Sequence, residues 1–103
     1  MSQNTNVLSV QATGTTVTSA GTTANVAIPT NAAGNVPMYC RLVSNTIVYA
    51  KIGNASVTAT TNDIMVTSTP ITVVTQGQAK IAYIQDAVTT GGKLNITPLE
   101  NFR

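Results

Sequence analysis

From Met38 onward, short runs of β-branched and other apolar residues alternate with Gly, Asn and Pro. Thr, Val and Ile favour strands over helices because their branched Cβ crowds a helical turn. Gly and Asn accept the positive φ of tight turns, and Pro cannot donate to a strand ladder. The pattern predicts an all-β chain: a small antiparallel β-sandwich, jelly-roll-like, of about eight short strands joined mainly by short turns.

Alternation within the runs also assigns side chains to faces. Tyr39 and Arg41 fall on one face of their strand, opposite Met38, Cys40 and Leu42. In the next run, Tyr49 and Lys51 likewise share a face. The eight expected strands are 23–29, 38–44, 46–52, 55–59, 63–66, 71–74, 80–86 and 93–100, and residues 7–12 are a candidate for a further short strand at the start.

The first third of the chain is patterned differently. It starts with the polar stretch MSQNTN and contains the low-complexity stretch TGTTVTSAGTT, which fits either an exposed strand pair or a flexible loop. We expect residues 1–23 to form an N-terminal arm that is flexible or embraces a partner. Residues 24–103 are expected to form the β-sandwich domain.

The surface of this domain is expected to be polar but nearly uncharged. Only 8% of the 103 residues are charged, against about a quarter in an ordinary protein. The basic residues are spread along the chain, whereas nucleic-acid binding requires a basic stripe, so we expect no nucleic-acid partner. An uncharged surface rich in hydroxyl and amide groups suits wide contact with another protein, because an exposed strand edge without charges promotes aggregation of a lone monomer.

The inventory of reactive side chains argues against catalysis. The chain has no His, one Cys and three acidic residues, Asp63, Asp86 and Glu100, which are far apart in the sequence. Cys40 lacks an imidazole base and is expected to be a small buried hydrophobic residue. We therefore expect no enzyme, no cofactor and no metal, with an all-oxygen calcium site at Asp63 as an open alternative.

A single cysteine excludes an intrachain disulfide and favours folding in a reducing cytoplasm. The first residues lack the basic and apolar regions of a signal peptide. No apolar run approaches the length of a membrane span, so no membrane partner is expected.

Three tyrosines, two of which share a strand face with a basic residue, are the candidate interface groups, because Tyr and Arg are enriched where proteins bind each other. The alternative is that each ring packs at the sandwich edge with its hydroxyl in water. The candidates are Tyr39, Arg41, Tyr49, Lys51 and Tyr83.

From Arg41 to Phe102 the chain resembles small capsid decoration proteins, also called cement or head-stabilising proteins, of tailed bacteriophages. The resemblance lies in the succession RLVSNTIVYAKIGNASVTATTNDIMV, TPITVVTQGQAKIAYIQ and KLNITPLENF. It implies a jelly-roll-like sandwich on the outer capsid surface, oligomeric around local symmetry axes and in contact with several coat subunits.

The expected function is therefore that of a decoration protein, made in the host cytoplasm and located in the virion, which stabilises the shell by bridging major capsid subunits. Its partners would be the major capsid protein and further copies of itself, as a dimer or trimer. One alternative is a structural component of a phage tail, fibre or head spike, with or without carbohydrate binding. Another is a calcium-dependent enzyme or lectin fragment.

Overall fold

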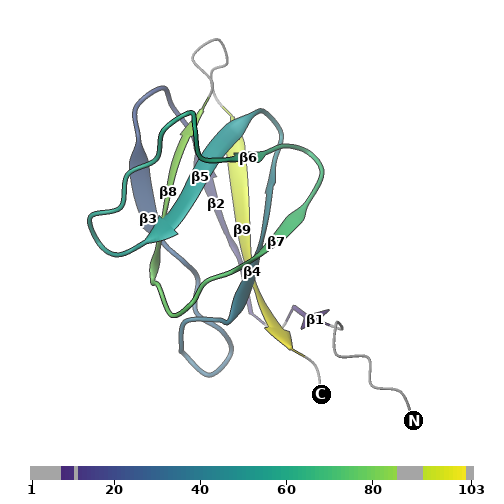
Figure 1. The fold of residues 1–103 in the computed structure, drawn as a ribbon. Coiled ribbons are helices and arrows are strands. Elements are labelled where there is room, and N and C mark those ends of the chain that lie inside the picture. Colours follow the sequence, from purple (N-terminus) through teal and green to yellow (C-terminus); the bar gives the residue numbers. More distant parts are fainter. Residues whose placement is uncertain (1–7, 11, 86–91, 102–103) are drawn as a thin grey trace.

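The computed structural model describes residues 8–10, 12–85 and 92–101, and these residues form strands and loops without any helix (Figure 1). Two antiparallel sheets pack face to face, which confirms the expected all-β sandwich. The strands are β1 (Leu8–Ser9), β2 (Thr15–Thr18), β3 (Ala24–Ala27), β4 (Tyr39–Ser44), β5 (Val48–Gly53), β6 (Ile64–Val66), β7 (Ile71–Val74), β8 (Lys80–Gln85) and β9 (Lys93–Asn101).

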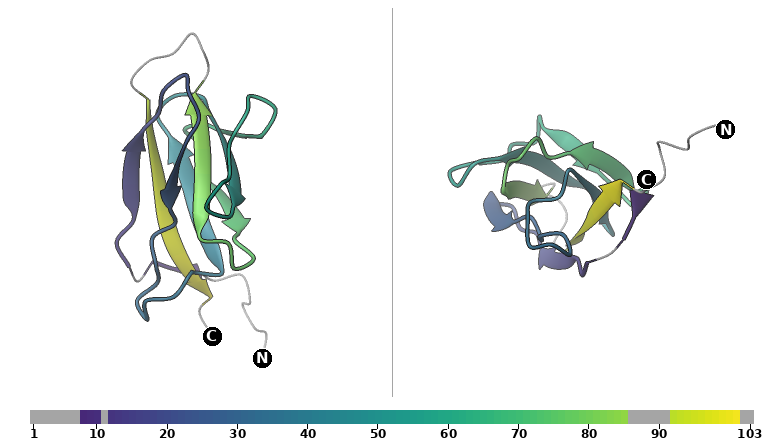
Figure 2. Two further views of the ribbon diagram at one scale, coloured as in Figure 1. Left: turned by 90° about the vertical axis from the view of Figure 1, so that its left-hand side faces the viewer. Right: turned by 90° about the horizontal axis from the view of Figure 1, so that it is seen from below.

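The two sheets are named here after β9 and β8. The β9 sheet has the order β1-β9-β4-β7, and β2 also pairs with β9. The β8 sheet has the order β3-β8-β5-β6. The edge-on view in Figure 2 shows the two layers side by side, with β2 and β9 in one and β3 and β8 in the other.

The strand pairs are nested along the sequence. β5 pairs with β6, β4 with β7, β3 with β8 and β2 with β9, all antiparallel. The chain is thus paired like one long hairpin with its turn between β5 and β6. Two further pairings, β4 with β9 and β5 with β8, join the nested pairs into two sheets.

The core lies between the sheets and consists of aliphatic side chains. Leu42 and Ile96 are paired in register on the inner face of the β9 sheet, and Ala50 is paired with Tyr83 on the inner face of the β8 sheet. Met38 was expected to share the face of Cys40 and Leu42, but it lies just before β4 and is 61% exposed. The buried cluster comprises Ile28, Cys40, Leu42, Val48, Ala50, Val66, Ile81, Tyr83, Leu94 and Ile96.

A buried polar tie connects the two sheets where β2 and β8 end and β9 begins. The Ser19 hydroxyl donates to Gln85 Oε1 over 2.9 Å, and the Ser19 amide donates to the Gly92 carbonyl over 2.8 Å. The Gln85 backbone amide donates to the Ala20 carbonyl over 3.0 Å. These bonds satisfy polar groups that would be costly to bury alone.

Two segments differ from the sequence-based expectation. Residues 55–59, expected to form a strand, lie in the β5–β6 connection. Here the Val57 amide donates to the Asn54 carbonyl and the Ser56 amide to Asn54 Oδ1, so the local bonds are those of a turn. Thr15–Thr18 fall inside the expected arm, yet they form β2 and pair with β9. The expected boundary at residue 23, between an N-terminal arm and the sandwich domain, stays a prediction.

Candidate interaction surface

The five predicted interface residues lie in three different places. Tyr39 and Arg41 share the outer face of the β9 sheet, and Tyr49 and Lys51 share the outer face of the β8 sheet, as alternation predicted. Tyr83 is 8% exposed and packs in the core. A partner that lies against one outer face therefore meets one of these Tyr-plus-cation pairs and not the other.

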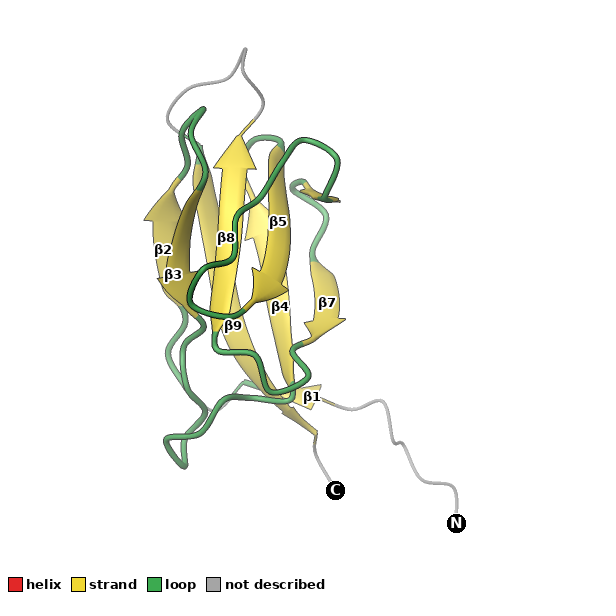
Figure 3. Ribbon diagram, turned by 60° about the vertical axis from the view of Figure 1, so that its left-hand side comes forward, coloured by secondary structure: helices red, strands yellow, loops and turns green. Residues whose placement is uncertain are grey.

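The outer face of the β8 sheet is partly covered by the chain itself. The β5–β6 connection, residues 54–63, passes over β8, and we call it the flap (Figure 3). Asn25 Nδ2 on β3 donates to the flap carbonyls of Ala55 and Val57, at 3.5 and 3.3 Å. Beneath the flap, Ala82 points outward by register but is 0% exposed. The flap thus closes the part of this face that lies over β3 and β8.

Most side chains on the outer face of the β9 sheet are exposed or half-buried, and we call it the open face, although its outward residues Thr97 and Leu99 are only 8% and 5% exposed. Along one row, Tyr39 lies in register between Val74 and Leu99. Because cross-strand neighbours on one face are about 5 Å apart, these side chains form an apolar end of the face. The outward side chains on its four longer strands are Thr16, Thr18, Tyr39, Arg41, Val43, Thr72, Val74, Lys93, Asn95, Thr97 and Leu99.

Arg41 lies near the middle of the open face, in register between Thr72 and Thr97. Its Nε is buried and has no hydrogen-bond partner among the described residues. Lys93 lies on the same face and its Nζ donates to Thr18 Oγ1 over 3.0 Å. The described part of the open face therefore carries two cations, and Asp63, the one acid whose side chain is described, belongs to the flap.

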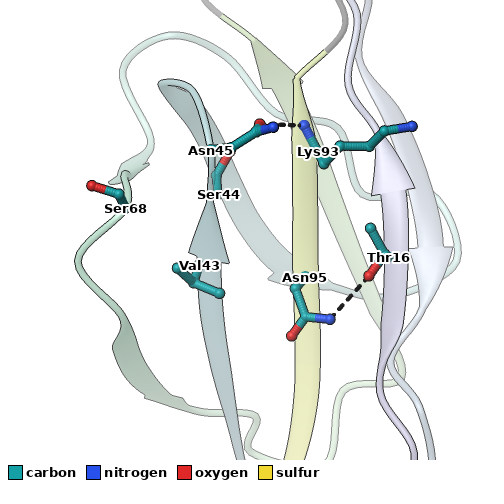
Figure 4. A pocket seen from close by; sticks show the side chains of 7 residues that line it. All are labelled: Thr16, Val43, Ser44, Asn45, Ser68, Lys93 and Asn95. Carbon is teal, nitrogen blue, oxygen red and sulfur yellow. Dashed lines mark hydrogen bonds between the residues drawn. The ribbon is translucent and has the colours of Figure 1, made fainter.

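Next to Arg41 the open face contains a shallow groove of about 320 Å³ (Figure 4). Several polar groups in its wall are bonded to one another: Asn95 Nδ2 donates to Thr16 Oγ1 and the Lys93 amide to Asn45 Oδ1. These bonds take up donors and acceptors that a sugar would use. The groove is lined by Thr16, Val43, Ser44, Asn45, Ser68, Lys93 and Asn95.

The two reactive groups singled out in the sequence have structural surroundings. Asp63 Oδ2 accepts from the Thr60 amide over 2.7 Å, and Oδ1 lies 3.6 Å from Lys51 Nζ. The backbone hydrogen bond from Thr60, assisted by the charge of Lys51, lowers the pKa of Asp63. Cys40 is fully buried, and this burial raises its pKa to about 11.

A metal site has no donor cluster in the described ranges: they contain no group of three or more His, Cys, Asp or Glu side chains placed to hold an ion. Residues 8–10, 12–85 and 92–101 likewise include no helix with the length and apolarity to cross a membrane.

Sequence reasoning found Tyr39 and Arg41 but missed their neighbours on the open face. Val74 and Lys93 come from strands far from β4 in the sequence, and only the pairing of β4 with β7 and β9 brings them together. Alternation in ITVV does place Thr72 and Val74 on one face, but it does not indicate which sheet they join.

Comparison of this chain with protein-family models, with curated proteins and with solved structures found no match.

Proposed function

We propose that this protein is a non-enzymatic capsid decoration protein of a tailed bacteriophage, which binds the outer surface of the shell through its open face. The observation that carries the proposal is the difference between the two outer faces. The flap covers much of the β8 sheet, whereas the outer face of the β9 sheet presents Tyr39, Arg41 and Val74. A chain with few charges thus has one broad face that the flap leaves uncovered and that suits contact with protein.

The composition of the open face supports a protein partner. Tyr, Arg and a rim of small polar side chains is the combination that protein interfaces favour. Arg41 and Lys93 make the face cationic, so the complementary coat surface carries carboxylates. An Arg guanidinium can bind such a carboxylate through two parallel hydrogen bonds.

The strand connectivity supports the same class of protein. Nested pairs from β5–β6 out to β2–β9, folded over into two sheets, are what a rolled-up long hairpin produces. We take this connectivity to be a jelly roll, a fold that is common among viral capsid proteins. Together with the sequence resemblance, it favours a virion protein over a metal-dependent enzyme or lectin.

The local chemistry fits a binding role. Cys40 is buried with a raised pKa, so it holds little of the thiolate that a nucleophile needs. The Asp63 carboxylate already accepts a hydrogen bond from the Thr60 amide and is paired with the Lys51 ammonium group. The side-chain amides of Asn45 and Asn95 in the groove are already hydrogen-bonded within the protein, which disfavours the carbohydrate-binding alternative.

The test uses undecorated capsids purified from the phage that encodes the chain. The protein is expected to bind them at a fixed ratio to the coat subunits and to raise the capsid melting temperature. R41Q removes the central cation of the open face and should weaken binding at least about tenfold, since a hydrogen bond to a charged group contributes roughly 1.5–3 kcal/mol.

K80Q is the matched control, because Lys80 lies on the outer face of the β8 sheet. It should bind like the unmodified protein. If the protein ignores capsids but binds cells or glycans, the fibre alternative is correct. If K80Q weakens binding and R41Q does not, the wrong face has been assigned.

A further inference from the structure

A second hollow lies on the β8 side of the sandwich, where β5 ends and the turn between β7 and β8 begins. Its volume is about 390 Å³, within the roughly 300–1,000 Å³ that small-molecule sites occupy. Val57 of the flap packs closely over Gly53, since a Cβ at Gly53 would lie only 2.7 Å from Val57 Cγ2. We call this hollow the amide pocket, because Asn54, Gln76 and Gln78 form part of its lining.

The polar groups of the amide pocket are available to a ligand, unlike those of the groove on the open face. Gln76 and Gln78 are exposed, and their side-chain amides make no hydrogen bond with another described residue. Asn54 Oδ1 accepts from the Ser56 amide over 3.0 Å, which leaves Asn54 Nδ2 as a donor. Three segments of the chain thus bring unused amide groups to one hollow.

Gln76 stands at a backbone position that its residue type disfavours. The Gln78 backbone amide donates to the Thr75 carbonyl over 3.0 Å and closes a turn in which Gln76 and Gly77 have φ angles of 53° and 79°. Two positive φ angles are typical of a type I′ turn, for which Asn-Gly is the favoured pair. A Gln in the left-handed region costs conformational free energy, and such strain is found where a side chain has a function. Gln76 lines the amide pocket, so ligand binding there is the function that its position offers.

The chemistry of the lining favours a neutral saccharide. Among the described residues that line the amide pocket, only Lys51 is charged, and its Nζ is already paired with Asp63 Oδ1 at 3.6 Å. A side-chain amide donates and accepts hydrogen bonds, as the hydroxyl groups of a sugar do. Ile52 and Val57 add apolar surface against which the C–H face of a sugar ring can pack. A protein partner, in contrast, needs a broad surface of about 800 Å² rather than a hollow.

We infer that the amide pocket binds a neutral saccharide. The inference rests on the proposed function for its consequence: the pocket lies on the β8 side, so it is directed away from the shell when the open face binds the coat. Each copy then presents one weak saccharide site to the surroundings of the particle. Many copies on one shell bind a polysaccharide far more tightly than a single copy does.

The experiment probes the full chain with a panel of neutral oligosaccharides built from glucose, galactose, mannose or N-acetylglucosamine, and with sialylated and sulfated oligosaccharides for comparison. Calorimetric titration then measures the Kd for the neutral oligosaccharide that binds best. Q76N and Q78A should each raise this Kd at least about tenfold, because each removes hydrogen bonds to the sugar hydroxyls. N62A is the matched control, since Asn62 is an exposed amide of the same flap outside the pocket, and it should bind like the unmodified protein.

Q76N also separates binding from stability. Asn suits the first position of a type I′ turn better than Gln, so Q76N should melt at or above the temperature of the unmodified protein while it binds saccharide more weakly. Failure of every neutral oligosaccharide to bind overturns the inference, as does preference for the charged ones or unchanged binding in both Q76N and Q78A.

Capsid binding distinguishes this inference from the proposed function. Q76N and Q78A leave the open face intact, so both should bind capsids like the unmodified protein. A protein that binds capsids but no neutral saccharide would refute the inference alone. A protein that binds a neutral saccharide through Gln76 and Gln78 but ignores capsids would refute the proposed function alone.

Discussion

The backbone amide of Ala59 in the flap donates a 2.8 Å hydrogen bond to Oγ1 of Thr23, in the turn before β3. With the bonds from Asn25, it fixes the flap against the β8 sheet and buries Ala59. Through this contact, a connection that sequence alternation predicts to be a strand becomes the cover of one face.

Replacing Thr23 by Val keeps the shape of the side chain but removes the acceptor. We expect T23V to lose about 1 kcal/mol of folding stability and to raise amide hydrogen exchange in the flap. T22V is the control, since Thr22 is exposed and its own hydroxyl takes no part in this bond. Equal exchange in the two variants would show that the Thr23 bond does not hold the flap.

Gly92 has no room for a side chain. A Cβ there would collide with Thr46 Oγ1 and lie 2.8 Å from Ser19 Oγ, inside the buried tie between the sheets. G92A should therefore destabilise the fold by about 1–3 kcal/mol, as overpacking does. At Gly21 a Cβ would have nothing within 4 Å, so G21A should melt close to the unmodified protein. A G92A melting temperature equal to that of G21A would contradict the packing described for this end of the sandwich.

Cys40 provides a probe of global unfolding. Because burial raises its pKa to about 11, the folded thiol is nearly all protonated as well as shielded. At about pH 8, a thiol reagent should label the native protein only at the rate of unfolding, and one equivalent should react at once in denaturant. Rapid labelling of the native protein would mean that the region around β4 opens independently of the rest.

Asp63 should make the protein sensitive to acid. Its folded pKa is lowered, chiefly by the Thr60 backbone hydrogen bond, below an unfolded value of about 3.9. The contribution is therefore present above the unfolded pKa and is lost as pH falls through the folded pKa. Urea midpoints measured between about pH 6 and about pH 2 should fall less for D63N than for the unmodified protein. Parallel curves would show that the carboxylate charge does not stabilise the flap.

The alternation of apolar and polar residues predicted much of this fold, because a strand with one buried face has its apolar residues at every second position. In YCRLVS, Cys40 and Leu42 point inward while Tyr39 and Arg41 point outward, as expected. The run KIAYIQ is apolar on both faces, so nothing in it indicated that Tyr83 faces the core and that Ala82 lies beneath the flap.

Long-range pairing was beyond the reach of local patterns. β2 joins β9 across most of the chain, and its Thr-rich sequence fits a loop as well as a strand. The open face depends on such pairings, since Arg41 comes from β4, Thr72 from β7 and Lys93 from β9. For this reason the sequence identified single residues of the face but not the face itself.

The most direct test of the account is a cryo-electron microscopy map of the decorated particle, into which the sandwich can be placed. We predict that the β9 sheet lies against the shell, with Arg41 over a carboxylate of a coat subunit and the flap turned away from it. A map in which the flap faces the shell, or in which the particle carries no density for this chain, would contradict it.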